Sequence, residues 1–287
     1  MNSGTLYLVA TPIGNLEDMT YRAVRTLKEV RWIAAEDTRQ TRKLTAHFEI
    51  PAKLISYHEH NKSASGPELI RLLKQGDSIA LVSDAGMPAI SDPGYDLVRQ
   101  AIAESIPVVP IPGANAALSA LVISGLPTDR FLFVGFLPRD KKELKQELEM
   151  LRKENATLLI YEAPHRVEKT LTAMLEGWGD RKAAMIRELT KKYEEAARGL
   201  LSECLAHVRE YHAQGEYCLV VEGAGLDVST LVSPEVEKLW WEGLSPEEHV
   251  TRYAEEGRTM KEAVKLAAAD RGVPKREVYN AVHRETP

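Results

Sequence analysis

The amino-acid sequence predicts an α/β protein that consists of two α/β domains and a small C-terminal helical module. Short apolar runs alternate with helical patterns over the first 125 residues, which is typical of parallel strands joined by helical crossovers. Strand-like runs resume after a segment with Gly and Pro at residues 125–129, and the pattern is wholly helical from Ser233 onward. We therefore expect an N-terminal α/β domain, a C-terminal α/β domain and a helical, partly basic module over residues 1–125, 126–232 and 233–287.

In the N-terminal domain the apolar runs are short and are bounded by turn-forming residues, as buried strands of a parallel sheet are. We expect strands near residues 5–10, 31–35, 53–56, 78–83 and 107–111. The helical patterns between them predict helices near residues 20–29, 38–48, 64–75, 94–104 and 114–124.

In the C-terminal domain we expect strands near 131–136, 157–161, 183–187 and 217–222, an edge strand near 194–198, and helices over about 140–153 and 165–177. Ser233 and Ser245 each precede a Pro and have the character of helix N-caps. The last two helical patterns are broken near Gly272, which is typical of a helix-turn-helix and equally of a small packing module.

Composition limits the classes of function. A formal net charge of −5 argues against a uniformly basic nucleic-acid binder, although residues 258–284 hold seven Lys or Arg against three acids. Cys204 and Cys218 lack the spacing of a metal site, so we expect both in the core. No run approaches the roughly 20 apolar residues of a membrane span and no leader precedes the first strand, which predicts a cytoplasmic protein with no membrane partner.

Three strands of the N-terminal domain end in similar loops. The strand before Asp84 runs into small, acidic and turn-forming residues, and Gly-containing turns follow the strands that end near Ala10 and Ile111. Ligands of open parallel sheets bind just past the carboxyl ends of the strands, and Gly lets a ligand approach the main chain closely. We expect the three loops to line one site.

Six segments carry a resemblance to a known family. They are Leu8–Leu16, Ala35–Arg39, Ser83–Pro88, Pro112–Ala116, Gly135–Pro138 and Tyr161–Arg166. In these segments the chain resembles the tetrapyrrole methylase superfamily, and within it the bacterial enzymes that methylate a cytidine ribose 2′-hydroxyl of 16S ribosomal RNA. The first loop, Thr11-Pro12-Ile13-Gly14-Asn15, lacks the Gly-rich, Gly-Asp-containing form of tetrapyrrole methylases proper, which makes a porphyrin-like substrate less expected.

The resemblance implies two α/β domains of the tetrapyrrole-methylase type, S-adenosylmethionine bound in a cleft between them, and a homodimer. It places the cofactor against residues of both domains, namely Pro12, Asp84, Ala85, Gly86, Ile90, Asn115, Ala116, Phe136, Tyr161, Glu162 and Ala163, the last ones through main-chain contacts to adenine. Asp84 would hold the methionine amino group or attract the sulfonium, and its alternative role is an Asx-turn that closes the strand end.

Methyl transfer to a ribose hydroxyl benefits from a general base. The candidate catalytic residues are Glu36, Asp37, Glu162 and His165, with His58 as a further candidate base, and the sequence does not rank them. Asp37 or Thr38 would serve equally well as the cap of the following helix, and His165 as a helix-start residue.

Candidate RNA contacts are Arg39, Arg42, Tyr57, His58, His60, Lys275 and Arg276. The run Arg139-Asp140-Lys141-Lys142 is a further candidate for phosphate binding, although charge runs on helices are usually solvated faces. His58 and His60 share one side of an extended segment, but no third ligand is indicated, so we expect no metal.

The leading hypothesis is an S-adenosylmethionine-dependent 2′-O-methyltransferase that acts on a cytidine of 16S rRNA in the small ribosomal subunit. Two alternatives are a methyltransferase for a small, tetrapyrrole-like molecule and a non-catalytic RNA-binding assembly factor.

Overall fold

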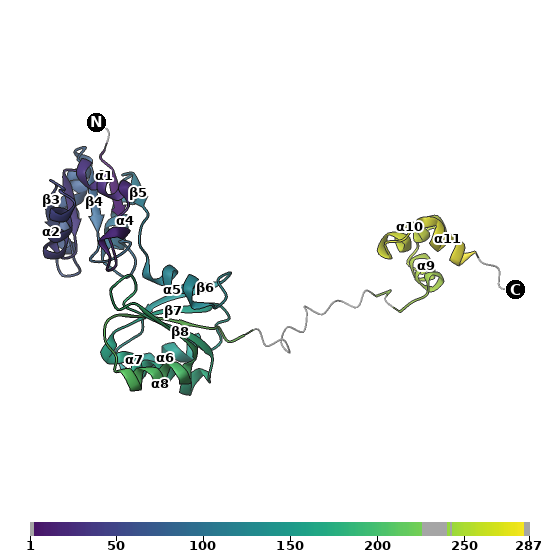
Figure 1. Cartoon of the computed structure of the whole chain (residues 1–287). Helices are drawn as coiled ribbons and strands as arrows, with labels where there is room; N and C mark the ends of the chain where they lie inside the picture. Colours follow the sequence, from purple (N-terminus) through teal and green to yellow (C-terminus); the bar gives the residue numbers. More distant parts are fainter. Residues whose placement is uncertain (1–2, 226–239, 242, 284–287) are drawn as a thin grey trace. The chain divides into compact units, whose positions relative to one another are not determined.

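The computed structural model describes residues 3–225, 240–241 and 243–283. The chain divides into two compact units, Met1–Gly225 and Leu226–Pro287. The first unit contains both α/β sheets, and the second is helical (Figure 1). Within the described residues, no helix is long and apolar enough to cross a membrane.

The first sheet has five parallel strands in the order β3-β2-β4-β1-β5. The strands are β1 Leu6–Val9, β2 Trp32–Ala35, β3 Lys53–Ser56, β4 Ile79–Val82 and β5 Val108–Ile111. Every residue of β4 is buried, as expected for a central strand with helices on both faces. The expected parallel sheet is confirmed.

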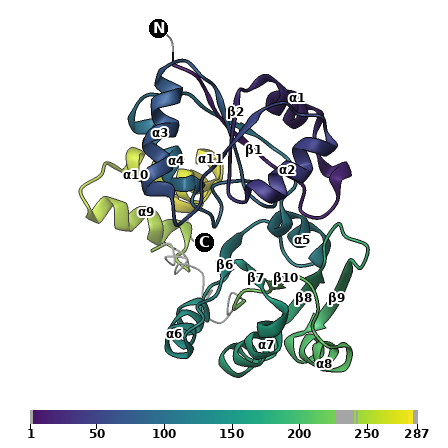
Figure 2. The ribbon, with the colours of Figure 1, turned by 90° about the vertical axis from the view of Figure 1, so that its left-hand side faces the viewer.

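Helices cover both faces of this sheet. They are α1 Tyr21–Glu29, α2 Thr38–His47, α3 Lys62–Lys74 and α4 Gly94–Ala103, with a 3₁₀ turn, η1, at Leu16–Asp18. Figure 2 shows α1 and α2 on one side and α3 and α4 on the other. The core is accordingly split, with Leu27 and Ile33 in one cluster and Leu69 and Leu81 in the other.

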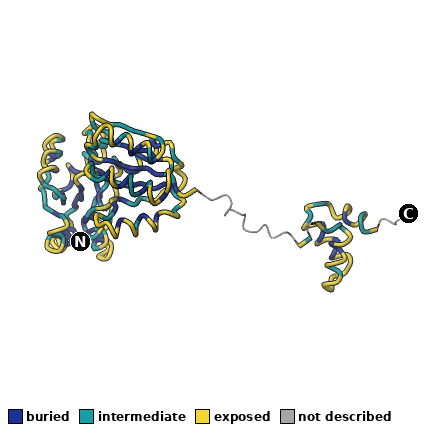
Figure 3. Tube along the Cα trace, turned by 90° about the horizontal axis from the view of Figure 1, so that it is seen from below, coloured by how far each residue is buried: buried dark blue, intermediate teal, exposed yellow. Residues whose placement is uncertain are grey.

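The second sheet is mixed, in the order β6-β7-β10-β8-β9. Its strands are β6 Phe131–Phe136, β7 Thr157–Glu162, β8 Lys182–Arg187, β9 Glu195–Leu200 and β10 Tyr217–Val221. Only β6 and β7 run parallel; the other neighbours are antiparallel. The expected edge strand near 194–198 is confirmed as β9. The central strands β7, β10 and β8 are mostly buried and belong to the dark interior in Figure 3.

Three helices, α6 Lys141–Leu151, α7 Pro164–Trp178 and α8 Leu201–Tyr211, cover one face of the second sheet. The opposite face is covered by α5 Ala116–Ser124, whose Ala120 and Leu121 pack with Leu159 and Val220 (Figure 1). The expected domain boundary at residue 125 therefore comes after α5 in the sequence, although α5 packs against the second sheet. We propose that the division lies in the loop before Asn115.

The second unit contains α9 Pro246–Glu255, α10 Met260–Asp270 and α11 Lys275–Val282. Val250, Val264 and Val278 form its small core. The predicted cap at Ser245 is confirmed, because its side chain accepts from the Glu248 N–H, and Gly272 lies in the turn before α11 with φ +64°. The predicted cap at Ser233 and the boundary at residues 232–233 lie outside the described residues.

Both cysteines are buried and free, as predicted. Burial raises the pKa of the Cys218 thiol to about 12, so this side chain is protonated and unreactive at neutral pH.

Candidate functional site

The three similar loops meet at the carboxyl edge of the first sheet. Thr11 and Gly86 exchange two main-chain hydrogen bonds, with N···O distances of 2.9 and 3.1 Å. Gly86 has φ +77°, and a Cβ at this position would lie 3.2 Å from Ile13 Cγ2 and 3.4 Å from the Ala114 carbonyl oxygen. The loops after β1, β4 and β5 are thus in mutual contact around Gly86, which confirms that they come together.

Two acidic residues connect the loops after β2 and β4, which are neighbouring parallel strands. Asp84 Oδ1 accepts from the Asp37 N–H at 2.9 Å, and the Glu36 carboxylate accepts from the Asp84 N–H. Asp84 therefore joins the two loops, in contrast to the Asx-turn within its own loop that was the alternative. Its side chain remains exposed.

Glu36 stands in a negative environment. Burial raises its pKa above the usual value, and the carboxylates of Asp84 and Asp92 raise it further. The raised pKa makes the Glu36 carboxylate a stronger base, which suits proton removal at physiological pH.

Asp92 is a member of this acidic cluster that the sequence analysis missed. Its Oδ1 accepts from the N–H groups of Ala89 and Gly94 at 3.0 and 2.7 Å, whereas its buried Oδ2 has no hydrogen-bond partner. Burial raises the pKa of this carboxyl. The available signal was the Asp-Pro-Gly sequence, but it is equally typical of an ordinary turn and helix start.

The loop between β4 and α4 holds two residues in the left-handed region, Ala89 with φ +69° and Ser91 with φ +61°. Such conformations cost free energy and tend to occur at functional sites. A Cβ at Gly135, on β6, would lie 3.3 Å from Ser91 Oγ. This strained loop therefore reaches the second sheet.

The second sheet contributes aromatic side chains at the carboxyl end of β7. Tyr161 packs against Phe133 and Phe136, with ring centroids 5.2 and 5.6 Å apart, and its hydroxyl accepts from the Ala117 N–H at 3.1 Å. Phe136 is 60% exposed and Ile90 is 41% exposed. The structure thus leaves apolar surface on both sheets near the strained loop.

The Glu162 carboxylate has a structural role, which argues against its assignment as a catalytic group, whereas its expected main-chain contact to the cofactor stays a prediction. Its carboxylate is fully buried and is engaged by the Thr170 hydroxyl at 2.6 Å, the Ala163 N–H at 2.8 Å and the Arg166 guanidinium at 3.4 Å. The Ala163 N–H is consequently occupied by this carboxylate, and the expected main-chain contact of Ala163 to adenine stays a prediction. A polar residue at the end of a buried strand gives no sign in the sequence of this inward orientation.

Asp37 is the N-cap of α2, because its Oδ1 accepts from the Arg39 N–H at 2.8 Å. The Arg39 guanidinium also pairs with this carboxylate at 2.7 Å, and these hydrogen bonds lower the pKa of Asp37 to about 2. A carboxylate with so low a pKa is a weak base, so the capping role is the one that the geometry supports.

Tyr57 is not available to stack on a base, which corrects its assignment as an RNA contact. Its side chain is 1% exposed, and its hydroxyl donates to the Pro93 carbonyl oxygen at 3.3 Å. His58 and His60 lie nearby with ring centroids 6.0 Å apart, and the buried Nδ1 of His58 has no partner. The described part of the chain contains no group of three or more His, Cys, Asp or Glu side chains that would hold a metal.

The remaining candidates are distributed between the two units. Asn115 caps α5 by accepting from the Leu118 N–H at 2.9 Å, and Ala116 begins that helix, while Pro12 and Ala85 lie in the clustered loops. His165 is exposed in the first turn of α7, and Arg42 is exposed on α2. Lys275 and Arg276 are exposed in the first turn of α11, in the second unit.

Lys191 is a second residue near the loops that the sequence analysis missed. A Cβ at Gly14 would meet its side chain, and its Nζ pairs with Glu188 and Glu216, both at 2.9 Å. The pairing ties the loop after β8 together where it touches the loop after β1. No signal in the sequence joins residues so far apart.

Comparisons with known proteins define the class. The model of the family of tetrapyrrole (corrin/porphyrin) methylases matches residues 5–205. The solved structure of uroporphyrin-III-C-methyltransferase from Thermus thermophilus is similar with a TM-score of 0.56 at 20% identity, over 77% of this chain and 95% of that one. Cobalt precorrin-4 methyltransferase is similar with a TM-score of 0.58 at 14% identity, with the same coverage of both chains. At such identities the structures show a shared fold, that of the methylases.

Two curated relatives extend the similarity to almost the whole chain. Ribosomal RNA small subunit methyltransferase I of Halalkalibacterium halodurans is 59% identical over 284 residues, which are 99% of this chain and 96% of the relative. The protein of the same name from Bacillus subtilis is 56% identical over 280 residues, 98% of this chain and 94% of the relative. The chain therefore belongs to the tetrapyrrole methylase family and, within it, to the group that these two methyltransferases represent.

Proposed function

We propose that this enzyme is an S-adenosylmethionine-dependent methyltransferase that methylates the ribose 2′-hydroxyl of a cytidine in 16S rRNA of the small ribosomal subunit. The observation that carries the proposal is the identity of 59% and 56%, along nearly the full chain, to two proteins named ribosomal RNA small subunit methyltransferase I. The similarity to the uroporphyrin enzyme is one of fold and carries no argument for a tetrapyrrole substrate.

The residues at the carboxyl edge of the first sheet suit a cationic cosubstrate. When bound, S-adenosylmethionine supplies an electrophilic methyl group on a positively charged sulfur. Glu36, Asp84 and Asp92 give this edge a negative potential, which favours a cation. Ile90 and Phe136 offer exposed apolar surface for the uncharged parts of such a molecule.

Proton removal from the ribose hydroxyl is assigned to Glu36. Its carboxylate is held by the Asp84 N–H, and burial together with two neighbouring carboxylates raises its pKa. The remaining contribution of the protein is to hold the two substrates in line and to exclude water, which accounts for a large part of the rate of such transfers.

Labelled-methyl transfer to small ribosomal subunits, followed by mass mapping of the RNA, tests the proposal. We expect one labelled cytidine with the methyl group on its ribose. Transfer to no ribosomal RNA would refute the proposal, and so would transfer to a base nitrogen or carbon.

Binding of S-adenosylmethionine to Asp84 variants tests the cofactor site by calorimetry. Asp84→Ala removes the charge and the hydrogen bond to Asp37, whereas Asp84→Asn removes the charge and keeps an acceptor. We expect both variants to bind S-adenosylmethionine more weakly than the parent, because charge-assisted contacts are worth about 1.5–3 kcal/mol. Asp84→Ala should have the larger effect, since it also removes the hydrogen bond to Asp37. Asp129→Ala, an exposed carboxylate in the loop before β6, is the matched control and should bind as the parent does.

The proposal includes a homodimer and a cytoplasmic location. Exposed apolar side chains lie on α5 and on the edge strand β6, namely Leu118, Val122, Phe131 and Leu132. Apolar residues on an unpaired edge strand and on the outer surface of a helix favour contact with a second copy. Sedimentation equilibrium tests this: Val122→Asp should shift the protein from dimer to monomer, and a monomeric parent protein would contradict it.

A further inference from the structure

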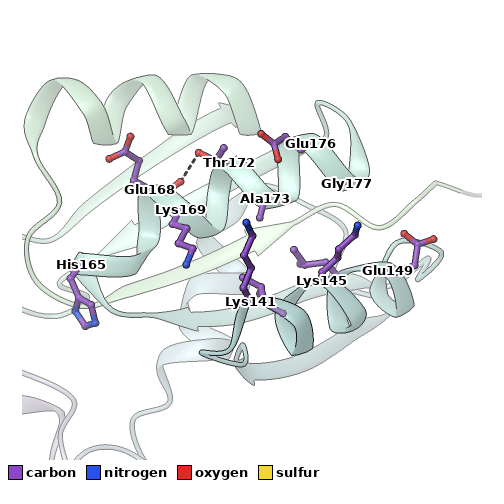
Figure 4. Close-up of a pocket in the computed structure, with 12 residues that line it drawn as sticks. Lys141, Lys145, Glu149, His165, Glu168, Lys169, Thr172, Ala173, Glu176 and Gly177 are labelled. Carbon is purple, nitrogen blue, oxygen red and sulfur yellow. Dashed lines mark hydrogen bonds between the residues drawn. The ribbon is translucent and has the colours of Figure 1, made fainter.

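A groove of about 700 Å³ lies between α6 and α7, on the face of the second sheet opposite to α5. Its floor is apolar and includes Leu144, Leu148 and Ala173. Figure 4 shows Lys141 and Lys145 extending from α6 and Lys169 from α7 toward the space between the two helices.

Positive charge in the groove is unpaired. Within the described residues, no carboxylate lies within ion-pair distance of Lys141, Lys145 or Lys169. Two of the three acidic residues that line the groove, in contrast, have ion-pair partners. Glu168 points away to Arg209 at 2.8 Å, and Glu149 lies 3.7 Å from Arg152, which leaves Glu176 at the far end (Figure 4).

The positive charge is concentrated at one end. Lys141 and Lys145 occupy the first two turns of α6, and His165 and Lys169 occupy the first two turns of α7. Each pair is four residues apart and therefore on one side of its helix, separated by a rise of about 6 Å. Glu149 and Glu176 stand in the later turns. Both helix N-termini add a partial positive charge at the basic end.

The basic end adjoins the candidate site. The helices α6 and α7 follow the parallel strands β6 and β7, whose carboxyl ends carry Phe136 and Tyr161. The Arg166 guanidinium fixes this junction, because it donates to the carbonyl oxygens of Leu137 and Pro138, both at 2.9 Å. A linear polymer that extends from the candidate site past the carboxyl ends of β6 and β7 would therefore enter the groove at His165.

We propose that this groove binds the sugar-phosphate backbone of the RNA strand beside the nucleotide that is methylated. Lysines repeated along two helices suit a polyanion, whereas a single phosphate would need donors that converge on one point. The apolar floor accommodates ribose and base surfaces between the phosphate contacts. This inference rests on the proposed RNA substrate and adds a binding surface outside the methyl-transfer site.

The test compares two triple variants of the full chain. Lys141→Ala/Lys145→Ala/Lys169→Ala removes the basic groove. The control Lys28→Ala/Lys74→Ala/Lys153→Ala removes the same charge from exposed lysines at or just after the C-terminal ends of α1, α3 and α6, at the opposite edges of the two sheets. For each protein, the Kd for 16S rRNA is measured between about 0.05 and 0.3 M salt.

Each phosphate contact to a single strand contributes about 0.7 to the slope of log Kd against log salt. Loss of three contacts should therefore reduce the slope by about 2 and weaken binding on the order of 100-fold at 0.1 M salt. The control variant should retain the parent slope. Equal slopes for the groove variant and the parent would overturn the inference.

Two further measurements separate this inference from the proposed function and from folding. The groove variant should bind S-adenosylmethionine with the parent affinity and unfold at the parent urea midpoint, since the three side chains are exposed. If the parent enzyme methylates no ribosomal RNA, the proposed function fails. If it methylates RNA and the groove variant has the parent KM for RNA, the groove inference alone fails. Dissociation of a dimer in the groove variant with unchanged RNA affinity would assign the groove to a second copy of the chain and would also overturn it.

Discussion

Glu36 combines the two features that a carboxylate base needs, partial burial and a fixed position. Its acceptor bond to the Asp84 N–H holds the carboxylate, and burial with two acidic neighbours raises its pKa. Glu36→Gln keeps the size of the side chain and removes the base. We expect kcat to fall about 10²- to 10⁴-fold, as is typical of general bases, with little change in the affinity for S-adenosylmethionine. Single-turnover methyl transfer measures this, and a loss below about threefold would exclude Glu36 as the base.

The pH profile gives an independent readout of the same group. Activity requires ionised Glu36, so kcat should fall as the pH drops through the raised pKa of this residue. Asp84→Asn removes one of the charges that raise this pKa. At saturating S-adenosylmethionine, the acid limb of the Asp84→Asn profile should therefore move to lower pH; an unmoved limb would show that the limb belongs to another group.

Glu36 also predicts a dependence of stability on pH. Because the folded protein raises the pKa of Glu36 above its ordinary value of 4.5, ionisation of this group costs free energy of folding. The cost is absent below the ordinary pKa and complete above the raised one. Glu36→Gln should therefore be more stable than the parent at pH 7, and the difference should shrink toward about pH 4. Urea unfolding at both pH values measures it.

Single side chains are also where the sequence was least informative. Tyr57 directly follows a strand and Glu162 is the last residue of one, so the sequence permits an outward or an inward orientation of either side chain. Their partners are the Pro93 carbonyl oxygen, at the N-cap of α4, and the Thr170 hydroxyl, within α7, and neither contact is marked in the sequence. Asp84 was correctly placed at a strand end, yet its link to Asp37 depends on β2 and β4 being neighbours, which their order in the chain does not reveal.

At the scale of the elements, the loops after β1 and β4 are joined by the two main-chain hydrogen bonds between Thr11 and Gly86, and this contact requires glycine at position 86. Gly86 has φ +77°, and a Cβ would press on Ile13 and on the Ala114 carbonyl group. Gly86→Ala should destabilise the protein by about 1–2 kcal/mol, the cost of a left-handed conformation for a residue with a Cβ, and should weaken binding of S-adenosylmethionine. Gly177→Ala is the control. It lies within α7 with no atom within 4 Å of its added Cβ, and it should stabilise by up to about 1 kcal/mol. Urea midpoints of the two variants should therefore shift in opposite directions.

Most elements could be predicted because their patterns are local. The five strands of the first sheet are short apolar runs between turn residues, and their parallel arrangement follows from the helices between them. The sheet against which α5 packs could not be predicted in this way. Its sequence, Ala116–Ser124, is apolar on most sides, so it has no polar face to mark which sheet it covers. Its packing against β7, β8 and β10 is a long-range property, fixed in part by the hydroxyl of Tyr161 on the Ala117 N–H.

At the scale of the whole molecule, the negative charges of the candidate cofactor site and the positive charges proposed to bind RNA lie on different surfaces. The candidate cofactor residues all lie in the first unit, and those of the first sheet lie at an edge rich in carboxylates, although the chain as a whole is also acidic. An acidic protein that binds RNA must do so through local basic surfaces, since each phosphate contact requires a nearby cation. The groove between α6 and α7 is one such surface in the first unit, and the first turn of α11 is a candidate for a second in the other unit.

This separation predicts that the second unit affects RNA affinity alone. Lys275→Ala/Arg276→Ala removes two exposed cations from the start of α11, and we expect the Kd for 16S rRNA to rise roughly tenfold at 0.1 M salt, with unchanged affinity for S-adenosylmethionine. Glu277→Gln, in the same helical turn, is the control of opposite sign and should leave RNA binding equal or tighter, since it removes a negative charge. Filter binding and calorimetry measure the two affinities. If the double variant binds RNA as the parent does, RNA recognition rests on the first unit, and α11 is a packing module.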